Sequence, residues 1–261
     1  MAEDSSPSGG ILGFFLGMVI AAGVYIAVML PIGADLMTAL IVAAVAAVIG
    51  ATYGAIAFSK KVLRVGFFGI VGFILDMSWS LLNTLAGLLV WIPACLITGA
   101  NFVGPNDDSR RSGTLVYDSN PRGGVYGATT IGTVIAGGWS SHEEIHVWQG
   151  RIFGPLYMPA YIIALILNIP FRLITTRTED LILESYYRIP FEDWAYWAGQ
   201  PSGSDINWGG WFLGFLLALV YTAALISIPL GIAFGIFPLW LAAIGVLVAY
   251  SLIRAFAPSG H

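Results

Sequence analysis

The chain has 261 residues, of which 57% are hydrophobic and only 10% are charged. Soluble domains typically carry about 25% charged residues, so lipid is the expected solvent for much of this chain. The 11 Lys and Arg residues form no dense run, and we therefore expect no nucleic-acid partner. The single cysteine, Cys95, lies in an apolar run and excludes a disulfide framework.

The N-terminal residues 1–10 are acidic and rich in Ser, Gly and Pro, which predicts a disordered tail. They lack the basic start of a signal peptide, so we expect the apolar run at 11–31 to be retained as a helix. A second apolar run at 37–58 completes a predicted transmembrane hairpin. Glycines spaced four apart in both runs favour close helix packing, although Gly is also common in membrane helices generally: Gly13, Gly17, Gly50 and Gly54.

A short basic loop precedes a third apolar run at 65–98, which is too long for one straight span unless it tilts or projects. We expect Pro93 to end or kink it. Its polar residues have the spacing of one helical face: Asp76, Ser80, Asn83 and Thr84. A carboxylate at mid-membrane depth faces protein or water, so Asp76 and Asn83 are candidates for a polar site or for hydrogen-bond anchors between helices.

The longest polar segment is 99–139, and we interpret 99–210 as the functional region, with a membrane-associated helix at 153–174. Residues 114–117 and 126–135 are rich in β-branched and aromatic residues and predict short strands, arranged as a hairpin before a helix at 140–152. The apolar segment 153–174 is interrupted by three prolines, Pro155, Pro159 and Pro170.

Two further apolar runs, 211–228 and 231–253, are separated by Pro229 and predict a C-terminal transmembrane hairpin within 211–257. Together with the three helices expected within 11–98, this predicts a mainly α, polytopic membrane protein. We expect about five or six transmembrane or re-entrant helices and a small region with a short β-hairpin.

Residues 142–146 read His-Glu-Glu-Ile-His, the HExxH motif. On a helix, His142 and His146 lie one turn apart, so both imidazoles can reach one tetrahedral metal ion, while Glu143 can act as general base. The chain has only three histidines, and the third, His261, is terminal. Ser140 or Ser141 can cap the helix. The alternative is a surface amphipathic helix with two ordinary histidines.

A catalytic zinc site needs a third protein ligand. Downstream carboxylates offer four candidates: Asp180, Glu184, Glu192 and Asp193. We favour Glu192, because Pro190 is a typical first-turn residue and would place Glu192 at the start of a new helix. Glu184 is the alternative metal ligand.

Three motifs in order make residues 127–198 resemble a group of poorly characterised bacterial proteins with a gluzincin-like HExxH domain. The first is HExxHVxQ, matched here by residues 142–149 as His-Glu-Glu-Ile-His-Val-Trp-Gln. The second is a Gly-Pro-Leu-Tyr stretch at 154–157, and the third is Pro-Phe-Glu followed by an Ala-Tyr pair within 190–196. Ile189 stands where that group has Asn. The resemblance implies zinc bound by His142, His146 and Glu192, with Glu143 as catalytic base, in a zincin-like region.

Further residues are candidates for contacts to the metal ligands or the substrate. Gln149 shares the helix face of the two histidines and either orients the site or only packs. Asp76 and Asn83 are candidates for the same supporting role, and Tyr157 for a transition-state hydrogen bond, as are Tyr161, Tyr186 and Tyr187. Arg188, like Arg151, either binds a substrate carboxylate or pairs with Asp or Glu.

Because His146 and Glu192 must meet at one metal, segment 153–174 cannot carry them to opposite faces of the bilayer. We therefore expect it to be re-entrant, interfacial or folded against the third apolar run, with three full spans before the site and two after it. Comparing Lys60, Lys61 and Arg64 with the more numerous arginines on the site side favours a cytoplasmic site and an external N-terminus. The resemblance implies the inner membrane of a bacterial cell.

These features predict a membrane-embedded zinc metallopeptidase or related hydrolase that attacks a peptide or amide carbonyl. Its substrate would be a membrane peptide, a protein or a lipid amide. The alternative is a non-catalytic subunit or assembly factor of a membrane complex, with a structural zinc and partner subunits. A transporter or channel using Asp76 and Asn83 is a third possibility, which rests on a single intramembrane charge.

Overall fold

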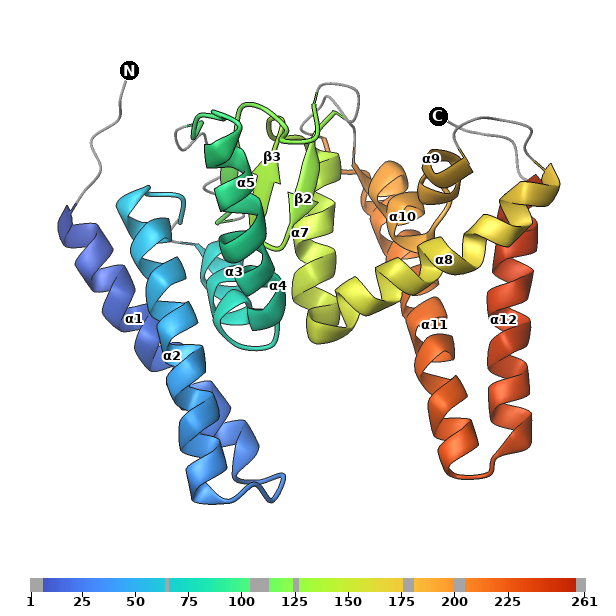
Figure 1. Ribbon diagram of the computed structural model, residues 1–261, viewed down its shortest axis with the longest axis horizontal. Helices are drawn as coiled ribbons and strands as arrows, with labels where there is room; N and C mark the ends of the chain where they lie inside the picture. Colours follow the sequence, from blue (N-terminus) through green and yellow to red (C-terminus); the bar gives the residue numbers. More distant parts are fainter. Residues whose placement is uncertain are drawn as a thin grey trace. The chain divides into compact units, whose positions relative to one another are not determined.

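The computed structural model describes residues 7–63, 66–103, 113–123, 127–175, 181–199 and 205–256. Its contacts divide the chain into two compact units, Met1–Pro155 and Leu156–His261. The fold is the expected one, a mainly α-helical polytopic protein with one small three-stranded sheet (Figure 1).

The first unit begins with a long helical hairpin of α1 (Pro7–Met29) and α2 (Leu36–Ser59). A Cβ atom built on Gly13 would lie 2.1 Å from the carbonyl oxygen of Gly54, and one on Gly17 would lie 2.0 Å from that of Gly50. The glycines therefore permit the close helix packing predicted from their spacing. Helix α1 already includes residues 7–10, so the predicted tail is helical there, and residues 1–6 lie outside the described residues.

The third apolar run is not a single helix, which corrects the expectation that its polar residues share one helical face. It divides into α3 (Phe67–Met77), α4 (Leu81–Ala86), the π-helical turn η1 (Gly87–Trp91) and α5 (Ile92–Ile97). The axis bends by 82° between α3 and the helices that follow. The break lies at residues 78–80 and not at Pro93, which is tolerated in the first turn of α5.

A physical cause for the break is visible at its first residue. The hydroxyl of Ser78 donates to the carbonyl oxygen of Ile74 at 2.6 Å, and the Ser78 backbone leaves the helical region with φ −126° and ψ −99°. Serine side chains compete for backbone hydrogen bonds in this way. The break then directs Ser80 and Asn83 towards a later helix, α7, whose contacts are described below.

The sheet contains β1 (Leu115–Tyr117), β2 (Thr129–Ile131) and β3 (Val134–Ala136), in the order β1-β3-β2. The second predicted strand, 126–135, is in fact the hairpin of β2 and β3, and its first residue lies outside the described residues. Gly132 makes the turn at φ +61°, and a Cβ there would lie 2.0 Å from the Asn83 carbonyl oxygen. The turn therefore requires glycine for both conformation and space. Strand β1 pairs with β3 in parallel.

Helix α7 (Ser141–Phe153) follows the sheet and carries the HExxH motif (Figure 1). The core of the first unit lies between α2, the broken helices and the sheet, where Tyr53, Met77 and Val134 are buried in one cluster. A short 3-10 turn, η3 (Gly154–Leu156), ends α7, and Gly154 has a positive φ of 54°.

The second unit consists of α8 (Tyr157–Thr175), the short helices α9 (Leu181–Tyr186) and α10 (Pro190–Ala198), and the hairpin of α11 (Trp208–Ala233) and α12 (Phe237–Phe256). Pro229 lies inside α11 instead of separating the two helices of this hairpin, which corrects the predicted boundary. Proline is tolerated within membrane helices, and Gly235, at φ 66°, lies in the turn.

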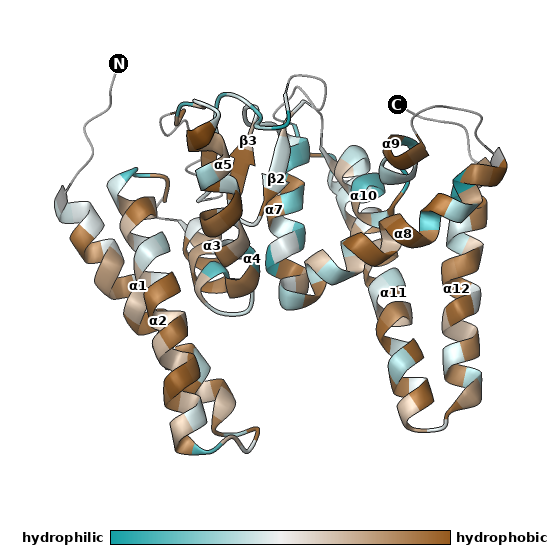
Figure 2. Ribbon diagram, in the orientation of Figure 1, coloured by the Kyte–Doolittle hydropathy of each residue, from teal (hydrophilic) through white to brown (hydrophobic). Residues whose placement is uncertain are grey.

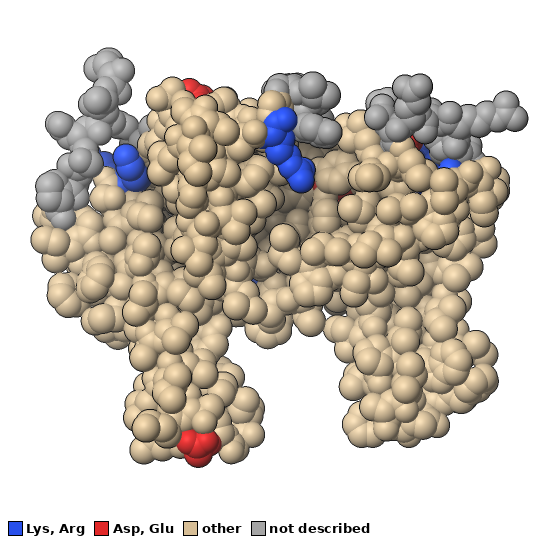
Figure 3. All heavy atoms as spheres, in the orientation of Figure 1, with Lys and Arg blue, Asp and Glu red and all other residues tan. Residues whose placement is uncertain are grey.

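Within the described residues, five helical segments are long and apolar enough to cross a membrane: Ser8–Met29, Leu36–Ser59, Ser141–Ile174, Trp208–Ala233 and Phe237–Phe256. The bent segment from α3 to α5 makes a sixth if it counts as one span. Two unbroken candidate membrane spans therefore precede the HExxH motif, whereas the sequence predicted three. In Figure 2 the α1–α2 and α11–α12 hairpins are largely apolar, and in Figure 3 their visible lengths show almost no charged side chains.

The basic loop and the sheet lie at the same end of the first unit, which corrects the expectation that the third apolar run crosses the membrane fully between them. The ammonium group of Lys60 lies 4.9 Å from the centre of the Phe102 ring, and Phe102 bridges to Tyr117 of β1. Since α1 and α2 are antiparallel neighbours, the start of α1 also lies at this end. The turn with Asp35 lies at the other.

Candidate metal centre

The motif helix begins where its sequence predicts. The Ser140 backbone is extended, and its hydroxyl accepts a hydrogen bond from the Glu143 backbone N–H at 3.3 Å. This side chain satisfies one of the free N–H groups at the start of α7. Glu143 and Glu144 lie in the first turn, where a negative charge interacts favourably with the helix dipole.

The two motif histidines face one another one helical turn apart. The Nε2 atoms of His142 and His146 are 3.2 Å apart, and the ring planes are nearly perpendicular at 84°. Two nitrogens bound tetrahedrally to one zinc ion at about 2.0–2.1 Å would be about 3.3 Å apart. Both side chains are buried. The spacing therefore matches that of two ligands of one ion.

Gln149 contacts the ring nitrogen of His146 that is not the one facing His142. Its Oε1 atom lies 2.9 Å from Nδ1 of His146, and because a carbonyl oxygen only accepts, Nδ1 carries the hydrogen. In the neutral ring the lone pair then lies on Nε2, the atom that faces His142. Hydrogen bonds of this kind commonly fix the tautomer and orientation of a metal-binding histidine. This contact agrees with the orienting role proposed for Gln149 from its position on the helix.

Glu143 is held by a residue that the sequence did not single out. The Thr130 hydroxyl of β2 donates to Oε2 of Glu143 at 2.6 Å and lies 3.3 Å from its backbone carbonyl oxygen. Only its place in a predicted strand just before the motif could have drawn attention to Thr130. The strand and the motif helix are thus linked at the residue expected to act as the base.

Glu192 lies in the first turn of α10, as Pro190 predicted. Ile189 is the extended residue before the helix, and the Glu192 side chain is fully buried. The Tyr161 hydroxyl, from α8, donates to Oε1 of Glu192 at 2.5 Å. Tyr161 also stacks on the Phe191 ring.

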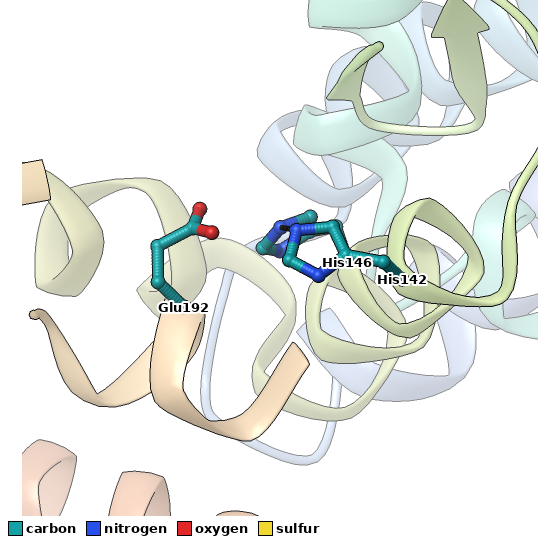
Figure 4. Close-up of side chains that lie close together, drawn as sticks. All are labelled: His142, His146 and Glu192. Carbon is teal, nitrogen blue, oxygen red and sulfur yellow. Dashed lines mark hydrogen bonds between the residues drawn. The ribbon is translucent and has the colours of Figure 1, made fainter. Parts of the chain in front are cut away.

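His142, His146 and Glu192 form a buried group that can hold a metal ion, and Figure 4 shows their side chains. One candidate ligand atom from each residue lies within 4.8 Å of the others. Two imidazoles and one carboxylate are a ligand set that zinc binds well, with a fourth position left for water or substrate. The donor set therefore fits zinc.

The other carboxylates named as possible third ligands are engaged elsewhere or not described. Glu184 is partly exposed and lies 3.9 Å from Nε of Arg188 as an ion pair. Asp193 accepts a hydrogen bond from the Tyr250 hydroxyl at 2.7 Å and pairs with Arg254. Asp180 lies outside the described residues. Among the described candidates, only Glu192 belongs to the group with the two histidines.

Arg188 and Tyr157 occupy structural positions near Glu192. The Arg188 guanidinium donates to the Arg254 carbonyl oxygen at 2.8 Å, and burial lowers its pKa, with the Arg254 charge adding to the effect. The Tyr157 ring packs edge-on against Phe191 with ring centres 5.3 Å apart. Both side chains stabilise the region that presents Glu192, and a role towards substrate remains a prediction for each.

Asp76 and Asn83 contact the C-terminal half of α7. Asp76 forms a buried ion pair with Arg151, with Nε–Oδ1 and Nη2–Oδ2 distances of 2.9 and 2.8 Å, and Tyr53 donates to the same carboxylate. The Asn83 amide donates to the carbonyl oxygens of Gly150 and Gly154. Arg151 is nine residues beyond His142 on the helix, about 13 Å along its axis. These contacts agree with the anchor interpretation of Asp76 and Asn83.

The end of α7 is thereby capped by the break in the third apolar run. Ser80 donates to the carbonyl oxygen of Gly150 at 3.0 Å, and the Trp79 indole donates to that of Ile152 at 3.0 Å. The last carbonyl groups of a helix have no partner within it, and buried ones need other donors. The bend at 78–80 supplies these donors, and so fixes the helix that carries both histidines.

Comparisons with known proteins found no match: no protein-family model, no curated protein and no solved structure is similar to this chain.

Proposed function

We propose that the protein is a membrane-embedded, zinc-dependent hydrolase of the metallopeptidase type. The observation that supports this most directly is the facing pair of Nε2 atoms, 3.2 Å apart, in a buried group that includes the Glu192 carboxylate. In this proposal His142, His146 and Glu192 hold the ion, and Glu143 is the catalytic base. The resemblance of residues 127–198 to gluzincin-like proteins agrees with these roles.

Zinc bound by these residues would polarise a substrate carbonyl and make water a nucleophile near neutral pH. The chain's own part is proton transfer. Glu143 would take a proton from the attacking water as the new C–O bond forms, and would deliver it to the leaving nitrogen as the C–N bond breaks. The Thr130 hydroxyl engages Oε2 of Glu143 and leaves Oε1 for this transfer.

The proposed substrate has a peptide or amide bond and reaches the centre from the membrane environment. The support is the setting of the motif helix, which belongs to a candidate membrane span from Ser141 to Ile174. A membrane peptide, a membrane protein segment and a lipid amide share this chemistry.

The structural-zinc alternative also has an observation in its favour. Each of the three ligands is at least nine-tenths buried, and the Glu143 carboxylate already has a partner in Thr130. A closed centre of this kind would suit a non-catalytic subunit or assembly factor of a membrane complex, with other subunits as its partners.

Two measurements separate these functions. Purified full-length protein should contain one zinc per chain, and His142→Ala should lose it, whereas Glu184→Gln should not. Glu143→Gln should keep the zinc and abolish hydrolysis of membrane-peptide and acyl-amide substrates. Equal activity in the Glu143→Gln variant would support the structural alternative, and protein without zinc would contradict both.

We also propose that the end of the first unit with the sheet faces the cytoplasm of a bacterial inner membrane, together with the start of α1, in place of the external N-terminus expected from the sequence. Lys60 and Lys61 lie at that end, and the opposite turn carries Asp35, the arrangement that the positive-inside rule favours. Labelling of single cysteines at positions 33 and 61 with an impermeant maleimide in intact cells tests it. Labelling at 61 and not at 33 would reverse the orientation.

A further inference from the structure

A groove on the first unit lies apart from the metal centre, between α1, α2 and α3. Its volume is about 430 Å³, within the range of small-molecule sites. Apolar side chains form most of its wall, among them Leu16, Ile20, Phe58 and Phe73. Lys61 is the one charged residue among those that line it.

The Lys61 side chain is not accounted for by contacts within the described chain. Its neighbour Lys60 lies over the Phe102 ring, whereas Lys61 is exposed and forms no ion pair or side-chain hydrogen bond with a described residue. A lysine can cover apolar surface with its stem while its ammonium group stays at the polar boundary. An apolar groove with one available cation has the chemistry to bind an anionic amphiphile.

The backbone of Lys61 gives a second, independent indication. Lys61 is the only described non-glycine residue with a positive φ, at 54°. Its N–H bonds to the Phe58 carbonyl oxygen and the Val62 N–H bonds to that of Ala57, which is the Schellman arrangement at a helix end. Glycine is usual at this position because a side chain is strained there. A lysine here thus accepts local strain, which is a feature of functional positions.

We propose that this groove binds an anionic phospholipid, with an acyl chain against the apolar wall and the phosphate on the Lys61 ammonium group. The candidate span of α2 ends at Ser59, so Lys61 follows at the level where lipid headgroups lie. The positive charge at the mouth and the apolar wall below it match the two parts of such a lipid. Neither feature depends on the proposed zinc chemistry.

The test compares lipids retained by the full-length protein after purification in detergent, counted by native mass spectrometry. Phosphatidylglycerol and phosphatidylcholine with the same acyl chains are supplied in equal amounts. Wild type should retain one phosphatidylglycerol in preference. Lys61→Asn removes the charge while asparagine tolerates the left-handed backbone, and it should reduce this preference about fivefold. Lys60→Gln is the matched control and should leave the preference unchanged.

Further variants and measurements distinguish the lipid from other possible occupants of the groove. Leu16→Trp should fill the groove and reduce retention of both lipids, and Lys61→Gly should lose the preference while unfolding at no lower temperature than wild type. An unchanged preference in Lys61→Asn would overturn the proposal. So would stabilisation by inorganic phosphate equal to that by the lipid, or a lipid-free dimer that covers the groove.

Discussion

Oε1 of Gln149 lies 2.9 Å from Nδ1 of His146, three residues along the same helix. With Nδ1 of His146 donating to Gln149, the lone pair of the neutral ring lies on Nε2, the atom that faces His142. Without a hydrogen-bond acceptor at position 149, the same helix would not determine which ring nitrogen of His146 carries the hydrogen. The pair therefore links the spacing of the motif to the chemistry of a metal ligand.

Removing this contact should weaken zinc binding without unfolding the protein. Gln149→Leu is similar in size but cannot accept a hydrogen bond, and the expected loss of zinc affinity is about 10- to 100-fold. Competition with a chromophoric chelator measures it. Gln149→Glu keeps the acceptor and should bind zinc at least as well as wild type. Equal affinity in the leucine variant would show that Gln149 only packs.

The contact between Thr130 and Glu143 should contribute to stability as well as to position. Thr130→Val keeps the shape of the side chain but leaves a buried carboxylate oxygen without its donor, at an expected cost of about 1–3 kcal/mol. Thermal unfolding of the purified protein in detergent measures the change. Thr130→Ser restores the hydroxyl and should recover most of the stability. Full stability in the valine variant would mean that water replaces the threonine.

The buried pair of Asp76 and Arg151 predicts a large but non-additive effect. Asp76→Asn or Arg151→Met alone leaves one buried charge without a partner, which costs about 3–5 kcal/mol. The double variant should be less destabilised than the sum of the single changes, as a double-mutant cycle of unfolding free energies would show.

Zinc affinity of the folded Asp76→Asn protein separates the two roles considered for this residue. An anchor for the far half of α7 should leave the affinity within about threefold of wild type. A fall of the size expected for a residue that supports a metal ligand, about 10-fold or more, would favour the other role.

The α1–α2 hairpin should tolerate no side chain at its crossing. A Cβ on Gly54 would lie 2.1 Å from the Gly13 carbonyl oxygen, so Gly54→Leu must separate the helices. The hairpin should lose its compact form, seen as higher protease sensitivity and a lower unfolding temperature. Gly23→Leu is the matched control, because a Cβ at Gly23 meets nothing within 4 Å. Similar effects of both changes would contradict a packing role for Gly54.

Patterns that depend on neighbours in the chain could be predicted well from the sequence. The apolar runs gave α1 and α2 within a few residues, and Ser140 and Pro190 predicted where α7 and α10 begin. Each of these signals acts within one or two turns of helix. Local composition and capping chemistry are sufficient to specify them.

Contacts between distant segments could not be read in the same way. The partners of Ser80 and Asn83, beyond the break at 78–80, lie in α7 about 70 residues later. The partners of the candidate site, Thr130 for Glu143 and Tyr161 for Glu192, lie 13 and 31 residues away from them. A threonine in a strand and a tyrosine in an apolar helix are ordinary residues until folding places a carboxylate beside each.

The capping of α7 by residues 79–83 has a consequence for biogenesis. The donors lie upstream of the carbonyl groups they serve, so they leave the ribosome and enter the bilayer before the motif helix is made. Chains fold from the N-terminus during synthesis. We therefore expect the bend to be available when the histidine helix is made, so that the final carbonyl groups of that helix meet donors that have already been synthesised.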